Sequence, residues 1–253
     1  MIIRIVCRCL FLTILLSPST GLAQALDQRE LRSQEDWWSS RRDSVGLAPD
    51  PRENARLAVV QVYAARTSGW KGLVAVHPWI IFKRAGETEY NRYEVISWGE
   101  GEKVRRNRNP PDGYWFGEKP HLLVEHRGQE AEAMIPQIAA AIITYPWPDT
   151  YLAWPGPNSN TFIAHIGREV PALKLDMPAN AVGKDFRSLL DPIGLPPSGR
   201  GVQVSVLGVA GITLGAEEGF ELNLLGLNLG LDFTPLRIRL PFIGSVGDDK
   251  LQS

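Results

Sequence analysis

The sequence predicts an α+β domain in which helices pack on an antiparallel sheet. Residues 57–64 and 73–83 are apolar and rich in β-branched side chains, which is typical of buried strands. A turn at residues 85–88 separates the second run from residues 90–98, so these two runs predict an antiparallel hairpin. Their mixture of apolar and polar residues indicates a sheet with one covered face.

Two helices are predicted from apolar residues at helical spacing. The first lies within residues 129–145, where four such residues form one stripe: Ile135, Ile138, Ala139 and Ile142. Because proline fits best in the first turn of a helix, Pro136 predicts that the helix begins there and that Gln129–Met134 form a separate turn. The second helix is predicted to begin near Ser159, and its stripe comprises Phe162, Ile163, Ile166 and Val170.

The C-terminal residues 201–247 predict a β-hairpin packed on the core. Its two strands are expected at 201–215 and 220–233, and the second strand alternates apolar residues with glycine or polar ones. We expect the apolar face to cover the core, and contact with a lipid surface is the alternative. Residues 175–195 are expected to be a loop with a short helix within 185–190.

The N-terminal residues 1–25 have the pattern of a secretory signal peptide, with two arginines, an apolar run and a small-residue cleavage site. This pattern predicts a periplasmic or secreted protein, and an uncleaved N-terminal anchor is the alternative. Residues 26–56 predict an arm whose Trp37 and Trp38 pack on the domain, and residues 57–200 are expected to form its core.

The composition excludes several classes of function. The chain carries 27 basic and 28 acidic residues, so no bulk attraction to nucleic acid is expected. Both cysteines, Cys7 and Cys9, lie in the predicted signal peptide, which leaves the mature chain without disulfides or thiol nucleophiles. The histidines lack the spacing of metal ligands, so we expect no metal and no cofactor.

Ser159 and His77 form a candidate catalytic pair. Ser159 lies at the start of a helix and on its apolar face, which directs it toward the sheet whose apolar strand carries His77. A serine nucleophile needs a neutral imidazole to take its proton, and a helix N-terminus offers N–H groups to an oxyanion. Asn158 or Asn160 is expected to add a side-chain donor. Two residues of the next strand are candidates for orienting the imidazole: Tyr93 and Glu94.

The alternative interpretation of these residues is structural. Asn, Ser and Thr are the preferred N-cap residues, so residues 158–161 are sufficiently explained as a helix start, and His77 as a buried, hydrogen-bonded histidine. A second candidate site is a basic loop beside an aromatic run. It is either a solvated loop or an anion-binding site formed by Arg105, Arg106, Arg108 and Trp115.

Several motifs resemble an uncharacterised bacterial family, a domain of unknown function. They include Val-His-Pro-Trp-Ile (76–80), Gly-Tyr-Trp-Phe-Gly (113–117) and Trp-Pro-Gly-Pro-Asn-Ser-Asn-Thr-Phe (154–162). More distantly, residues 158–162 are similar to the Asn-Cys-x-x-Phe-like helix start of circularly permuted papain-like proteins, including the NlpC-type, lecithin-retinol-acyltransferase-like and PPPDE-type groups. The resemblance implies a permuted papain-like core with serine at the position of the cysteine nucleophile. Serine forms no thiolate, so its activation would rest on His77 and the oxyanion donors.

Three functions are therefore expected. The first is hydrolysis or acyl transfer at an amide or ester in the cell envelope, by Ser159 and His77. The second is non-catalytic binding of an envelope small molecule, peptide or lipid in the same cleft. The third is a structural protein in peripheral contact with a membrane, through the hairpin and the tryptophan arm.

Overall fold

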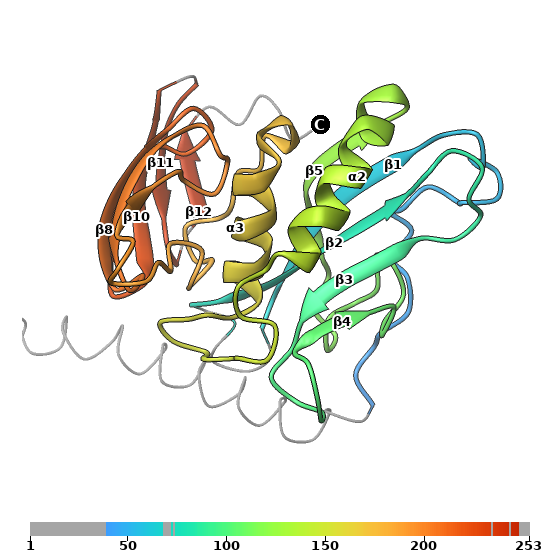
Figure 1. The fold of residues 1–253 in the computed structure, drawn as a ribbon, viewed down its shortest axis with the longest axis horizontal. Coiled ribbons are helices and arrows are strands. Elements are labelled where there is room, and N and C mark those ends of the chain that lie inside the picture. Colours follow the sequence, from blue (N-terminus) through green and yellow to red (C-terminus); the bar gives the residue numbers. More distant parts are fainter. Residues whose placement is uncertain (1–38, 68–71, 73, 234, 243, 248–253) are drawn as a thin grey trace, which may run out of the picture.

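The computed structural model describes residues 39–67, 72, 74–233, 235–242 and 244–247. They form an α+β structure with two antiparallel sheets, as Figure 1 shows, and this confirms the fold class. The predictions for residues 1–25 and for Trp37 and Trp38 lie outside the described residues. In the described part of the chain, no helix has the length and apolar character needed to cross a bilayer.

The first sheet has the strand order β4-β3-β2-β1-β5. Its strands are β1 (Val59–Arg66), β2 (Val76–Lys83), β3 (Asn91–Val95), β4 (Val104–Arg106) and β5 (His121–Arg127). The predicted hairpin is confirmed, because β2 pairs with β3 in antiparallel register. Two strands were not predicted: β4, which lies within the predicted basic loop, and β5, an edge strand with charged flanks.

Helices α2 (Gln129–Ile143) and α3 (Ser159–Glu169) pack on one face of this sheet. The predicted start of α3 at Ser159 is confirmed. The predicted start of α2 at Pro136 is wrong, because the helix begins at Gln129 and continues through the proline. Burial of Ala131 and Met134 against the core stabilises the first turns. This stabilisation outweighs the loss of the one backbone hydrogen bond that the proline cannot donate.

The second sheet has the order β12-β11-β10-β9-β8-β7-β6. Its strands are β6 (Ile193–Gly194), β7 (Gly201–Val206), β8 (Ala210–Gly215), β9 (Gly219–Leu224), β10 (Leu227–Phe233), β11 (Leu236–Leu240) and β12 (Gly244–Gly247). The predicted two-stranded hairpin is therefore wrong. Leu207 and Gly208 adopt positive φ angles of 54° and 70°, and this turn divides the expected strand 201–215 in two. The helix expected within 185–190 is also absent, since these described residues form turns and extended backbone.

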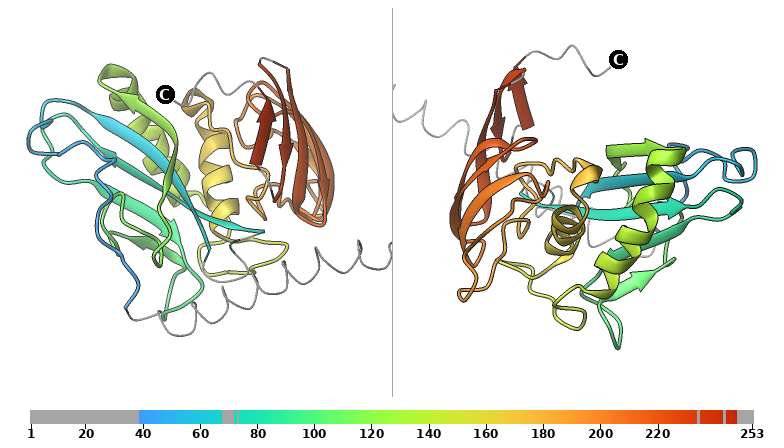
Figure 2. Two further views of the ribbon diagram at one scale, coloured as in Figure 1. Left: turned by 180° about the vertical axis from the view of Figure 1, so that it is seen from behind. Right: turned by 45° about the horizontal axis from the view of Figure 1, so that its top comes forward.

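Helix α3 lies between the two sheets in all three views of Figures 1 and 2. The second sheet faces the rest of the molecule with its polar side, contrary to the prediction. Gln203 and Asn228 on that side are buried, whereas Ile212 and Leu214 are 52% exposed on the other. The polar side is inward because Asp185, in the loop after α3, accepts hydrogen bonds from three amide side chains of the sheet: Gln203, Asn223 and Asn228.

Candidate functional site

His77 and Glu94 form a buried pair on neighbouring strands. The Nε2 atom of His77 lies 2.9 Å from Oε2 of Glu94, and the two side chains are 5% and 1% exposed. Both point to the face of the first sheet opposite α2 and α3, because they alternate with Val76 and Val95, which pack in the core beneath the helices. Of the two residues proposed to orient the imidazole, the structure therefore selects Glu94. Tyr93 points to the helix side and stacks on Phe82.

Two further side chains hold the Glu94 carboxylate. Arg92 donates from Nε and Nη2 over 3.1 and 2.9 Å, and Asn109 donates from Nδ2 over 3.0 Å. Burial alone would raise the pKa of Glu94, but hydrogen bonds and charges from His77 and Arg92 outweigh it and lower the pKa to about 2. Glu94 is therefore ionised at neutral pH, in a site from which water is excluded.

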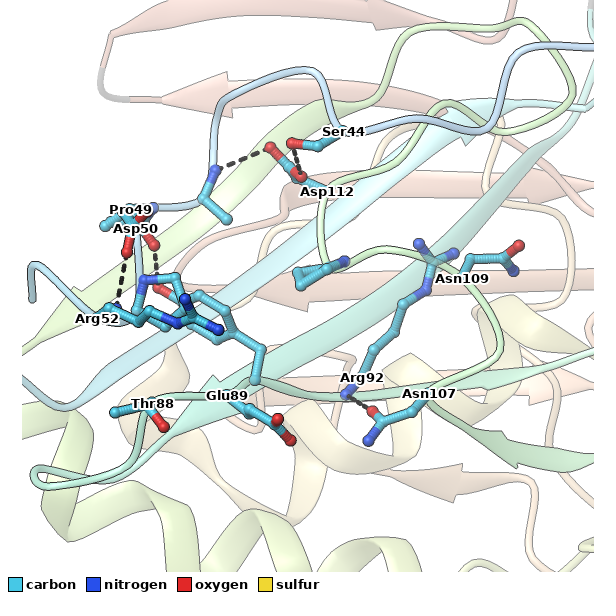
Figure 3. A pocket seen from close by; sticks show the side chains of 14 residues that line it. Ser44, Pro49, Asp50, Arg52, Thr88, Glu89, Arg92, Asn107, Asn109 and Asp112 are labelled. Carbon is cyan, nitrogen blue, oxygen red and sulfur yellow. Dashed lines mark hydrogen bonds between the residues drawn. The ribbon is translucent and has the colours of Figure 1, made fainter. Parts of the chain in front are cut away.

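Arg92 in turn borders a cavity of about 550 Å³, shown in Figure 3. The backbone N–H of Arg92 donates to Asn107 over 2.7 Å, and its guanidinium lies 4.1 Å from the centre of the Trp79 ring. Asp112 lines the same cavity and accepts from Ser44 and from two backbone N–H groups, which attaches residues 44–48 to the domain. These contacts fix Arg92, and through it Glu94.

The imidazole of His77 is fixed in both orientation and tautomer. Trp115 stacks on it with ring centres 3.6 Å apart and an interplanar angle of 9°. Burial lowers the pKa of His77 below its usual value, against the opposing hydrogen bond and charge of Glu94, so the ring is neutral at pH 7. Because an ionised Glu94 only accepts, Nε2 carries the proton and Nδ1 is left as a basic nitrogen.

The first turn of α3 is built by a capping box. The Oδ1 atom of Asn158 accepts from the backbone N–H groups of Asn160 and Thr161, and Thr161 accepts from the backbone N–H of Asn158. The Nδ2 atom of Asn158 donates to the carbonyl groups of Ala153 and Val182. Both amide hydrogens of Asn158 are thereby used, which gives this residue a positioning role.

Asn160 connects the helix to the strand that carries His77. Its Nδ2 atom donates to the carbonyl groups of Val76 and Val182, over 3.1 and 2.9 Å. Its amide hydrogens are thus occupied too, and neither asparagine has a side-chain N–H left for an oxyanion. In the first turn, the capping side chain reaches the N–H groups of residues 160 and 161, which leaves the backbone N–H of Ser159 as the candidate oxyanion donor.

Ser159 is 3% exposed, and its side chain lies beside the phenol of Tyr151, with which it lines a cavity. Burial raises the pKa of that phenol, and the contact with Ser159 opposes the rise. Within the described residues, no hydrogen bond joins Ser159 to His77. Tyr151 was not predicted, because a single tyrosine in a loop between helices carries no pattern that marks it as part of a site.

Ser159 and His77 nevertheless line the same cavity, of about 510 Å³. The cavity lies where β2 and β3 separate, since their pairing ends at Ile80 and Tyr93 and does not extend to His77. Through this gap the cavity reaches both His77, on one face of the sheet, and the start of α3, on the other. Most of its remaining wall is apolar or aromatic and includes Trp98, Trp115, Phe116, Trp154, Leu225 and Leu227.

The segment that carries His77, Ser159 and most of the cavity wall also matches a known family. The matching range is residues 57–186, which includes β1 to α3 and the loop that follows. The chain belongs to the family described as Protein of unknown function (DUF3750). No curated protein and no solved structure matches the chain. The expected membership of a family of unknown function is confirmed, and the papain-like resemblance stays a prediction.

In this DUF3750 protein, the predicted basic site is divided by the edge strand β4. Arg105 pairs opposite Glu94 and, with Arg108 and Trp115, lines a cavity of about 330 Å³. Arg106 alternates to the other side, where it donates to Asn91. The structure thus brings together three of the four residues predicted for ligand binding. Their cavity shares the Trp115 wall with the cavity of Ser159 and His77.

Proposed function

We propose that the protein is an acyl hydrolase or acyltransferase that acts on an amide or ester in the cell envelope, with Ser159 as nucleophile and His77 as general base. The single observation that carries this proposal is the buried pair of His77 and ionised Glu94, whose His77 lines the same cavity as Ser159. A buried, oriented imidazole with one free basic nitrogen is the group that a serine nucleophile requires.

In this proposal the hydroxyl of Ser159 gives its proton to Nδ1 of His77 as Oγ attacks the carbonyl carbon. The backbone N–H of Ser159 and the positive end of the α3 dipole stabilise the oxyanion. The protonated imidazole then gives its proton to the leaving group, and water or an acceptor alcohol or amine releases the acyl group. Glu94 stays ionised and stabilises the imidazolium, as its low pKa requires.

The cavity wall supports an apolar acyl group as substrate. Three tryptophans and two leucines contribute to the wall: Trp98, Trp115, Trp154, Leu225 and Leu227. Such a wall offers burial to an alkyl or aromatic chain and few partners to a sugar. The papain-like resemblance, which includes lipid acyltransferase-like groups, is consistent with this substrate class.

A serine-reactive fluorophosphonate carrying an alkyl chain tests the proposal. We expect covalent labelling at Ser159, loss of labelling in Ser159→Ala, and at least about a hundredfold slower labelling in His77→Gln. Ser188→Ala, at a described serine away from the cavity, is the matched control and should label normally. Labelling that persists in Ser159→Ala would contradict the assignment of the nucleophile.

A second candidate is binding of an anionic amphiphile without chemistry. It is favoured by the basic cavity on the other side of Trp115 and by the lack of a hydrogen bond between Ser159 and His77 in the described residues. Calorimetry with a long-chain alkyl phosphate distinguishes this non-catalytic binding from the proposed acyl transfer. Binding that is weakened by Arg105→Ala and Arg108→Ala, together with no labelling of Ser159, would establish this candidate instead.

A further inference from the structure

The outer face of the second sheet is a continuous apolar surface. Strand register aligns the outward positions in rows that cross the sheet. One row comprises Val202, Leu214, Phe220, Leu231, Ile238 and Val246. The next comprises Ile193, Val204, Ile212, Leu222 and Leu229. All of these described positions carry aliphatic or phenylalanine side chains, so none adds a charge or a hydrogen-bonding group.

This surface is open to solvent. Ile212, Leu214 and Ile238 are each 52% exposed, and no described segment of the chain covers them. The sheet cannot turn this face inward, because its other side is attached by buried polar contacts. Lys184 lies 2.6 Å from Glu221, both fully buried, and Asp185 holds three amides of the sheet.

The size of the face fits a stable protein interface. Seven strands spaced by ~4.8 Å give a width of about 29 Å. Three rows of outward residues, of which the third comprises Val206, Ala210 and Leu224, add a depth of roughly 15–20 Å. Pairing two such faces would bury roughly 900–1,200 Å² in total, close to the ~1,000 Å² that a specific interface needs. Apolar patches of several hundred Å² are uncommon on monomeric proteins and mark a partner surface.

Three observations favour a second sheet over lipid as the occupant. The outward rows lack the tryptophan, tyrosine and basic residues that anchor proteins at a membrane interface. The net charge of the chain is −1, which gives no attraction to anionic lipid. The sheet also has two open edges, β6 and β12, whose backbone groups would be unsatisfied in hydrocarbon but stay in water at the rim of a stacked pair.

We propose that this face binds the same face of a second copy of the chain, so that two sheets stack in a symmetric dimer. An uncharged aliphatic face is complementary to itself and holds no charge pattern that would select a different partner. Sheets packed in this way interdigitate their side chains at a separation of ~10 Å. The proposal does not depend on the chemistry of the Ser159 cavity.

Sedimentation velocity of the full chain in detergent-free buffer tests the dimer. We expect a dimer at micromolar concentration, and a monomer in the double variant Ile212→Glu and Leu229→Glu, because stacking would bury four uncompensated charges. The apparent dissociation constant should rise by roughly a hundredfold or more. Circular dichroism should be unchanged, since both positions are exposed in the single chain, and the melting temperature should lose only the contribution of dimerisation.

Ile143→Glu with Leu190→Glu is the matched control, because these residues are 84% and 96% exposed and lie outside the sheet face. This control should remain dimeric. The milder Ile212→Asn, expected to weaken the dimer roughly tenfold, serves if the charged variant fails to fold. A monomer at all concentrations overturns the proposal, and flotation of that monomer with phosphatidylcholine vesicles would assign the face to lipid. A dimer that survives Ile212→Asn and the folded charged variant also overturns it.

Discussion

Among single residues of the candidate site, Glu94 supplies the negative charge that balances its neighbours. It is the anion that faces both the guanidinium of Arg92 and the imidazole of His77. Glu94→Gln keeps the shape of the side chain but leaves Arg92, 1% exposed, without its charge partner. We expect a loss of about 3 kcal/mol or more in the free energy of unfolding, measured by urea denaturation at pH 7.

The effect of Glu94→Gln on the free energy of unfolding should depend on pH. The carboxyl has a pKa of about 2 in the folded protein against an ordinary 4.5, so its stabilisation is fully present above 4.5 and is lost as the pH falls toward 2. The stability difference between the wild type and Glu94→Gln should therefore shrink across that window. Asp43→Asn, which removes the fully exposed pair with Arg41, should show little difference at any pH.

His77 sets the expected pH profile of the reaction. Burial lowers its pKa below 6.5, so the basic form persists under mildly acidic conditions. If His77 is the general base, the rate of fluorophosphonate labelling should stay constant from pH 8 to about 6.5 and fall only at lower pH. An acidic limb with its midpoint above 6.5 would contradict this role of His77.

At the scale of elements, the second sheet depends on the ion pair between Lys184 and Glu221, which are both 0% exposed. Lys184→Met leaves the buried carboxylate of Glu221 with only the more distant Arg239, 3.8 Å away, as a cation, and we expect a cost of about 3 kcal/mol. Adding Glu221→Leu should recover most of this stability, since an apolar pair of similar volume removes the uncompensated charge. Equal stability of the single and double variants, in chemical denaturation, would exclude this coupling.

The elements also show what the sequence could and could not predict. The continuous apolar runs of β1 and β2 and the capping residues of α3 are local signals, and they predicted these elements correctly. Edge strands such as β5 need only one covered face, so their polar residues interrupt the apolar run that would predict a strand. Alternation in the second sheet identified two faces but not which one is inward, because that depends on the distant Lys184 and Asp185.

The candidate site was predictable to the same extent. The residue types and the helix start pointed to Ser159 and His77, and the structure places both on one cavity. The selection of Glu94 over Tyr93 follows from strand alternation in the folded sheet. Ser159 and His77 lie on two faces of that sheet, near the point where the pairing of β2 and β3 ends, and Tyr151 lies beside the serine. This arrangement depends on the folded sheet and could not be predicted from a sequence pattern.

For the whole molecule, Asp185 is one of the residues that attach the second sheet to the rest of the chain. Its carboxylate accepts from Gln203, Asn223 and Asn228 over 2.6–2.7 Å. In Asp185→Ala these buried amides lose their acceptor, so we expect faster amide hydrogen exchange throughout β7, β9 and β10 and unchanged protection in β1 and β2. Asp191→Ala, at an exposed carboxylate of the same loop, should leave both sheets protected. Uniform loss of protection in both sheets would show that they unfold as one unit.

The pairing order of the second sheet has a consequence for folding. Each of its strands pairs with its neighbour in the sequence, whereas in the first sheet β1 pairs with β5, which lies more than fifty residues later. Low contact order speeds folding, so the second sheet is expected to form before the first is complete. A refolding chain then carries an apolar sheet before the loop that holds Lys184 and Asp185 is in place. Refolding yield should therefore depend on protein concentration, because productive stacking and aggregation compete for the same surface at that moment.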